Sequence, residues 1–138
     1  MLILGHRGAP SQKTENTIDS FEVALSNNVD GIELDIQLTK DGKIAVYHDF
    51  IITAHNKSHL VSNLSLTNLH SLCTNFIMPS LEEVCEICPQ NKILNIEIKS
   101  QKLNNTTLIE QTLSVLEDYK LHDNVIISSF NPFVLREV

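Results

Sequence analysis

Alternating and short continuous apolar runs mark five predicted strands along the chain. The clearest covers 29–38, where Ile32, Leu34 and Ile36 alternate with polar residues. An Asp-Gly pair at 41–42 predicts a tight hairpin after it, and a two-residue loop there would place Asp35 opposite His48. The five predicted strands are 2–5, 29–38, 44–47, 93–98 and 125–127.

Apolar residues at three- and four-residue spacing predict helices between these strands. One helix begins after Asn16, and Ser80 is placed to cap another over 81–88. A short helical pattern covers 67–72 and a long one covers 107–119. Pro132 begins a last helix. Strands that alternate with helices in this way predict an α/β fold on a parallel sheet. The remainder of 50–79 shows the least regular pattern, and no linker divides residues 1–138 into two domains.

Charge and composition exclude several classes of partner. Ten Lys and Arg against seventeen Asp and Glu give a net charge of −7, which argues against nucleic acid and against an anionic membrane surface. The chain has no apolar run long enough to span a membrane and no secretory signal pattern. With three cysteines, an odd number, the sequence predicts a reduced, cytoplasmic protein without disulfides.

The cysteines also permit a zinc hypothesis. His70 and Cys73 precede Cys85 and Cys88 at spacings that a Cys₃His site could use. Cys85 and Cys88, however, continue the apolar stripe of the helix predicted over 81–88, and free cysteine behaves as a small apolar residue. We interpret the three thiols as core residues.

Acidic residues inside apolar strands suggest a cation site. Glu33 and Asp35 are two apart in a predicted strand and share one face, as do Glu97 and Lys99. Three carboxylates at neighbouring strand ends would form an oxygen-rich pocket for Mg²⁺ or Ca²⁺. The alternative is that each strand simply has a solvated face.

Two histidines end predicted strands and complete the candidate chemistry. His6 is followed by Arg7 and Gly8, and His48 is followed by Asp49. Two imidazoles around a phosphodiester can act as base and acid, and a guanidinium matches phosphate oxygens. A single histidine of this kind is more often a structural or surface residue than a catalytic one.

These residues stand in motifs that resemble the glycerophosphodiester phosphodiesterase family over residues 3–138. The motifs, in chain order, are His6-Arg-Gly8, Glu15-Asn-Thr17, Gly31-Ile-Glu-Leu-Asp35, Thr39-Lys-Asp-Gly42, His48-Asp49, Pro79-Ser-Leu-Glu-Glu83, Asn95-Ile-Glu-Ile-Lys99 and Ser128-Ser-Phe-Asn131. The resemblance implies a TIM-type (β/α) barrel with its site at the carboxyl ends of the strands. It also implies hydrolysis of a small-molecule glycerophosphodiester to glycerol 3-phosphate and an alcohol.

The resemblance further implies a role for each matching residue. Glu33, Asp35 and Glu97 would hold a divalent cation, Mg²⁺ or Ca²⁺. His6 and His48 would be the acid–base pair, Arg7 and Lys99 would stabilise phosphate charge, and Glu15 and Asn16 would support the site. A closely related alternative is a phospholipase-D-like enzyme of the sphingomyelinase D type, which cyclises its product, but those relatives are mostly secreted and disulfide-bonded, which this chain does not resemble.

The chain departs from the family pattern in two places. Residues 50–57 replace the family's usual sequence after His48-Asp49, which leaves the head-group preference open. The chain also has 138 residues, whereas a barrel of this type needs about 250. We therefore expect a barrel truncated after about strand five, with open sheet edges that self-associate or pair with a missing C-terminal part. A weakly active or inactive half-barrel that serves as a binding or assembly module is the alternative function.

Overall fold

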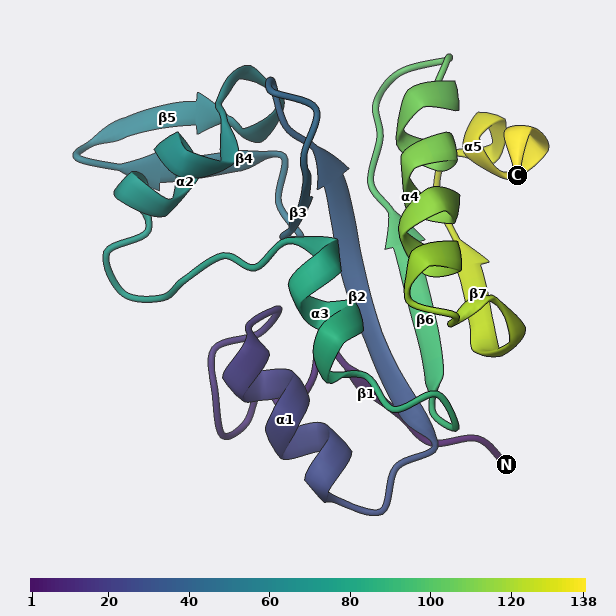
Figure 1. Cartoon of the computed structure of the whole chain (residues 1–138). Coiled ribbons are helices and arrows are strands. Elements are labelled where there is room, and N and C mark those ends of the chain that lie inside the picture. Colours follow the sequence, from purple (N-terminus) through teal and green to yellow (C-terminus); the bar gives the residue numbers. More distant parts are fainter.

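Four parallel strands form the centre of the molecule in the computed structural model, which describes residues 1–138 (Figure 1). They are neighbours in the order β1-β2-β6-β7, and a short strand, β3, pairs antiparallel with the end of β2. Their bounds are β1 Leu4–His6, β2 Gly31–Leu38, β3 Ile44–Val46, β6 Ile93–Ile98 and β7 Val125–Ser128. All five predicted strands therefore exist, and the third is antiparallel to the second, as the predicted hairpin requires.

Helices follow the parallel strands, and side-chain caps fix where most of them begin. Ser80 and Glu83 form a reciprocal capping box at the start of α3. Thr17, Ser65 and Asn131 each accept a backbone N–H bond at the start of another helix. The helices are α1 Ile18–Ser26, α2 Leu66–Leu72, α3 Leu81–Ile87, α4 Thr106–Asp118 and α5 Pro132–Glu137. None is long and apolar enough to cross a membrane.

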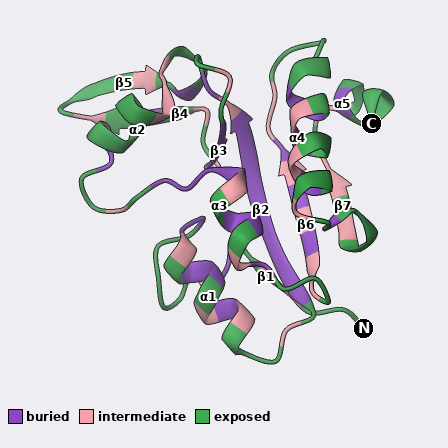
Figure 2. Ribbon diagram, viewed as in Figure 1, coloured by how far each residue is buried: buried purple, intermediate pink, exposed green.

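The two faces of the sheet have different surroundings because side chains alternate along each strand. Ile32, Leu34 and Ile36 of β2 are fully buried in the main core, together with apolar residues of α1, α3 and α4. Figure 2 shows β2 buried along its length between these helices. The alternate positions of β2, among them Glu33 and Asp35, lie on the opposite face of the sheet, against which these helices do not pack.

A second unit occupies the segment that the sequence pattern described as irregular. The strands β4 (Ile51–Ala54) and β5 (Lys57–Leu60) form an antiparallel hairpin. His55 and Asn56 connect them with φ angles of 51° and 58°, as a two-residue hairpin turn of type I′ requires. A 3₁₀ turn over Val61–Asn63 and α2 complete the unit around a small core of its own, which includes Ile52, Leu69 and Met78. The irregular sequence pattern of residues 50–79 did not predict this hairpin.

The hairpin between β2 and β3 has a longer turn than the sequence suggested. Gly42 has φ 73° and follows a turn closed by Thr39, so the loop contains three residues. The Thr39 hydroxyl donates to Asp41, and this bond lowers the pKa of the Asp41 carboxyl. The extra residue shifts the register by one, so Asp35 lies opposite Tyr47. The predicted pairing of Asp35 with His48 is wrong.

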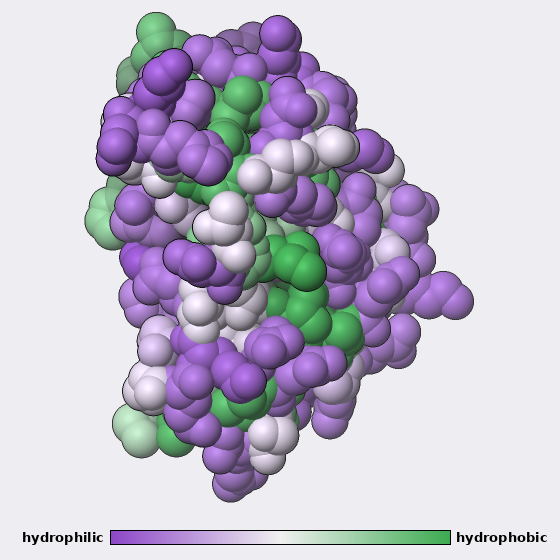
Figure 3. Space-filling model, turned by 90° about the vertical axis from the view of Figure 1, so that its left-hand side faces the viewer, coloured by the Kyte–Doolittle hydropathy of each residue, from purple (hydrophilic) through white to green (hydrophobic).

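The surface on the side of α1 and α2 is mostly hydrophilic, with a band of hydrophobic side chains across its middle (Figure 3). The sheet itself has open edges: β1 pairs only with β2, and β7 pairs only with β6. Open edges at the first and last parallel strands agree with the sequence expectation.

Candidate functional site

Three carboxylates converge on the face of the sheet opposite the helices. Asp35 on β2 is in register with Glu97 on β6, and Glu33 lies two residues before Asp35. One oxygen from each carboxylate lies within 4.8 Å of the other two. Glu33 is 7% exposed and Asp35 is fully buried, so the solvated-face interpretation of β2 is wrong. The structure therefore brings the predicted acidic cluster together.

The loop after β1 holds Arg7 against this cluster. Its backbone N–H donates to Glu33 at 2.9 Å, and its Nε lies 3.1 Å from Asp35 Oδ2. Its Nη1 donates to Glu15 at 3.0 Å. Arg7 has φ 54°, a left-handed conformation that is costly for a non-glycine residue and is common at functional sites. The loop thus aims both the backbone and the side chain of Arg7 at the acids.

Asn16 ties the same loop to β2. Its side-chain amide donates to Asp35 at 2.9 Å, and its carbonyl accepts the Asp35 backbone N–H at 3.3 Å. Its own backbone N–H donates to the Arg7 carbonyl. Asn16 is buried and also has a positive φ of 54°. Asn16 therefore fixes the orientation of the Asp35 carboxylate.

Lys99, immediately after β6, supplies a second positive charge. Its Nζ lies 2.5 Å from Glu97 Oε1 and 3.2 Å from Asp35 Oδ1. Burial opposes its charge, but the hydrogen bond to Glu97 and the nearby charge of Asp35 outweigh that effect and raise the pKa of Lys99. The ammonium therefore stays protonated at neutral pH. The ring of Phe130 lies 5.5 Å below it, a contact that the sequence analysis did not identify.

The cluster has the composition of a site for a hard divalent cation. Arg7 and Lys99 offset two of the three carboxylate charges, which leaves one net negative charge. Burial raises the pKa of Glu33, the Arg7 N–H opposes this, and the neighbouring Asp35 adds to it. Buried Asp35 Oδ1 accepts no hydrogen bond of good geometry. A carboxylate oxygen with a free lone pair among two further carboxylates fits Mg²⁺ or Ca²⁺.

The two histidines differ in their relation to the acids. His6 Nε2 lies 3.8 Å from Glu33 Oε2, at the rim of the cluster. His48 follows β3 and contacts Asp49 through Nδ1 at 2.7 Å, and no hydrogen bond or ion pair joins it to the three carboxylates. Because Nδ1 contacts Asp49, the other ring nitrogen of His48, Nε2, is available to a ligand.

The residues of the zinc hypothesis do not form a site. The ring of His70 contacts the Met78 carbonyl at 2.7 Å. Cys85 lies within α3 and Cys88 at its C-cap, and both are buried. Burial raises their pKa values to about 12 and about 11, which disfavours the thiolate that zinc requires.

A family model described as the glycerophosphoryl diester phosphodiesterase family matches residues 6–138. The chain belongs to this family. A glycerophosphodiester phosphodiesterase of Caldanaerobacter subterraneus is 36% identical to it across 99% of this chain and 61% of that protein. One from Bacillus altitudinis is 36% identical across 94% of this chain and 58% of that protein. The chain thus spans about 60% of the length of these family members.

Solved structures of the family have the same fold. The Thermotoga maritima enzyme superposes with a TM-score of 0.83 at 32% identity, across 99% of this chain and 57% of that one. A phosphodiesterase of Oleispira antarctica in complex with the product sn-glycerol-3-phosphate gives 0.87 at 26% identity, across 99% and 60%. These proteins are TIM barrels, and the parallel sheet described above forms part of that barrel. The predicted family and the barrel fold class are confirmed.

Proposed function

We propose that this chain carries the cation-binding and acid–base part of a phosphodiesterase that hydrolyses glycerophosphodiesters to glycerol 3-phosphate and an alcohol. The observation that supports it most is the convergence of Glu33, Asp35 and Glu97 beside Arg7 and Lys99. The relatives' names support the substrate class, and sn-glycerol-3-phosphate is the product bound in the Oleispira antarctica protein.

Glu33, Asp35 and Glu97 would hold a divalent cation, Mg²⁺ or Ca²⁺. When bound there, such an ion supplies Lewis-acid polarisation of a phosphate oxygen and helps to deprotonate the nucleophile. Asn16 keeps the Asp35 carboxylate in position through two hydrogen bonds. Glu15 supports the site indirectly, because it anchors Arg7 Nη1.

Arg7 and Lys99 would bind the phosphate itself. The guanidinium has five N–H donors; one Nη1 hydrogen is bonded to Glu15, whereas Nε lies 3.1 Å from Asp35 Oδ2 without a hydrogen bond. The remaining donors can reach phosphate oxygens. The Lys99 ammonium hydrogen-bonds Glu97 and lies 3.2 Å from Asp35 Oδ1 without a hydrogen bond, so it retains hydrogens for a phosphate oxygen. Both cations would stabilise the charge that accumulates on the phosphoryl oxygens in the transition state.

His6 and His48 would move the protons. One imidazole accepts a proton from the attacking water as the new P–O bond forms, and the other donates a proton to the alcohol oxygen as its P–O bond breaks. Glu33 beside His6 and Asp49 beside His48 would orient the rings and stabilise the imidazolium that forms. Three thiols in no disulfide suit a reducing compartment, and we propose that the reaction takes place in the cytoplasm.

The direct test is release of glycerol 3-phosphate from glycerophosphocholine by the folded chain with Mg²⁺ or Ca²⁺. We expect His6→Ala to reduce the rate by at least about 100-fold, since a positioned acid or base contributes that much. Chelation of the metal should have a similar effect. His122→Ala removes an exposed histidine and should leave the rate unchanged. No release from a folded, metal-loaded chain would favour the non-catalytic alternative.

We also propose that the open edges at β1 and β7 associate with a second copy of the chain. A parallel sheet of four strands is half of an eight-stranded barrel, and unpaired edge groups favour pairing. Ile126 of β7 and nearby Phe130 are exposed, at 44% and 91%. If the chain has no catalytic activity, measured self-association would favour the alternative function, an assembly module.

Sedimentation should then report a mass near twice the 15.5 kDa of the chain. A lysine on β7 disfavours edge pairing, so Ile126→Lys should shift the equilibrium toward the monomer. Ile51→Lys, at an exposed position of β4, is the matched control and should not. A folded monomer at high protein concentration contradicts this proposal.

A further inference from the structure

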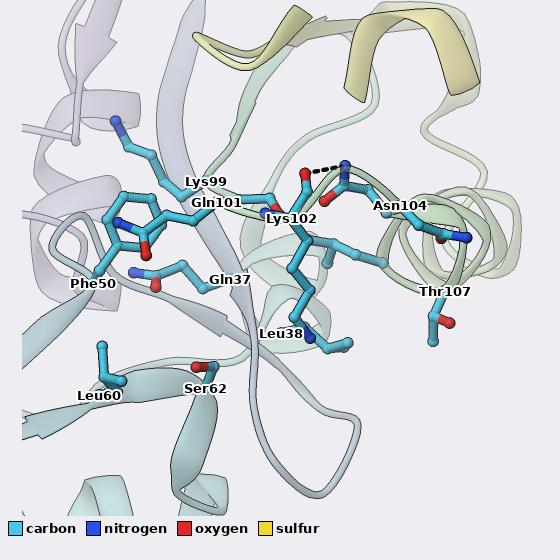
Figure 4. Close-up of a pocket in the computed structure, with 13 residues that line it drawn as sticks. Gln37, Leu38, Phe50, Leu60, Ser62, Lys99, Gln101, Lys102, Asn104 and Thr107 are labelled. Atoms are coloured by element: carbon cyan, nitrogen blue, oxygen red, sulfur yellow. Dashed lines mark hydrogen bonds between the residues drawn. The ribbon is translucent and has the colours of Figure 1, made fainter. Parts of the chain in front are cut away.

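A cavity of about 210 Å³ opens beside the carboxylate cluster. Its walls are the end of β2, the unit that contains the β4–β5 hairpin, and the segment that leads from β6 into α4. Figure 4 shows Leu60 and Ser62 on the hairpin side and Lys102 and Asn104 on the segment before α4. The volume is below the range of about 300–1,000 Å³ that is typical of complete ligand pockets, so the cavity suits one part of a substrate.

The position of Lys99 places this cavity next to the proposed phosphate site. Lys99 lines the cavity, and its Nζ also contacts Asp35 and Glu97. Gln37, which lines the cavity too, is two residues beyond Asp35 on the same face of β2. A phosphate bound at Arg7 and Lys99 would therefore direct one of its two ester substituents into this space.

The lining has a chemical character that selects among alcohols. It contains two lysines, Lys99 and Lys102, and no aspartate or glutamate. Amides and hydroxyls make up most of the rest, and Phe50 and Leu60 form an apolar wall. A quaternary ammonium would lose water of hydration there and meet the like charge of Lys102, without a carboxylate among the lining residues, because Lys99 is already paired with Glu97 and Asp35. A polyhydroxylated alcohol would instead find hydrogen-bond donors and acceptors among the amide and hydroxyl side chains of the lining, with the ring of Phe50 beside it.

We infer that this cavity binds the alcohol part of the diester and prefers polyhydroxylated head groups, such as glycerol or inositol, over choline. The inference rests on the proposed function. The residues that carry it, Phe50 and Leu60 at the hairpin and Gln101 and Lys102 before α4, lie outside the carboxylate cluster. They determine specificity by contact with the leaving group and take no part in proton transfer.

The test measures binding separately from turnover. Dissociation constants of glycerophosphoinositol, glycerophosphoglycerol and glycerophosphocholine are determined by calorimetry on the His6→Ala chain with Ca²⁺. We expect the first two diesters to bind about tenfold more tightly than the choline diester. Adding Lys102→Glu should reduce this ratio to about one or reverse it. Lys57→Glu makes the same charge change at the exposed start of β5 and should preserve the ratio.

Each result decides a different proposal. Equal or tighter binding of the choline diester overturns the inference. So does a Lys102→Glu effect that is the same for all three diesters, because the cavity would then hold the glycerol that they share. Absence of turnover of any diester by the wild-type chain overturns the proposed function, while the binding ratio still decides the role of the cavity.

Discussion

Asp35→Asn should weaken Mg²⁺ or Ca²⁺ binding by at least about 100-fold and destabilise the chain by about 3–5 kcal/mol. The substitution keeps the shape of the side chain but removes its charge. Asp35 is fully buried between Arg7 Nε and Lys99 Nζ, at 3.1 and 3.2 Å. Without the carboxylate, two largely buried cations lose a shared partner. The cluster also loses its net negative charge, so a divalent cation would enter a neutral site.

Calorimetric titration with each cation and urea unfolding measure the two effects. Asp19→Asn is the matched control, since Asp19 pairs with Lys13 on the surface at 3.4 Å. An exposed pair of this kind contributes about 0–1 kcal/mol, and its loss should leave cation affinity unchanged. An Asp35→Asn chain that binds either cation as well as wild type would contradict the assignment of this cluster.

Two members of the acidic cluster were predictable together because strand periodicity alone places them on one face. Glu33 and Asp35 must share a face if 31–38 is a strand, and apolar neighbours identify that strand as buried. What periodicity cannot give is the alignment of one strand with another. The pairing of Asp35 with Glu97 depends on how β6 docks beside β2, and the motif resemblance supplied that information.

The errors in the sequence analysis arise at turns. The loop after Leu38 could close with two or three residues, and the choice depends on Thr39, whose hydroxyl bonds Asp41 and the Lys43 backbone. One additional residue exchanges the two faces of the partner strand, so His48 was misplaced. At 55–56 the chain turns through His-Asn in the left-handed region, without the glycine that usually signals such a turn. Because His-Asn occupies the turn in place of a glycine, the β4–β5 hairpin was not recognised.

Residues 50–57 were expected to affect the head-group preference, but the set of residues that form the cavity walls escaped prediction for a related reason. Phe50 and Leu60 belong to the unrecognised hairpin unit, whereas Gln101 and Lys102 belong to an irregular segment before α4. Neither region has a periodic pattern, and only the tertiary fold brings them together. Phe130, exposed after β7, reaches Lys99 in the same way.

Gly8→Ala should destabilise the chain by about 2–5 kcal/mol, much of the 5–15 kcal/mol that a typical domain has. Gly8 has φ 87°, and a Cβ there would lie 2.4 Å from Ser20 Oγ and 2.6 Å from the Ser20 carbonyl carbon. The backbone of α1 cannot move away without disturbing the core around Phe21. The absence of a side chain at this position is therefore what allows α1 to pack against the loop.

Gly42→Ala separates the strain of a positive φ angle from the steric clash with α1, the two causes of the expected loss at Gly8. Gly42 also has a positive φ, 73°, but a Cβ there meets nothing closer than Gln111 Nε2 at 3.8 Å. It should cost only the conformational strain, about 1 kcal/mol. The difference between the two variants in urea unfolding then measures the close packing of the Arg7 loop on α1. Because that loop carries Arg7 to Glu33 and Asp35, Gly8→Ala should also weaken cation binding, whereas Gly42→Ala should not. Equal losses of stability in the two variants would show that packing at Gly8 does not hold the loop in place.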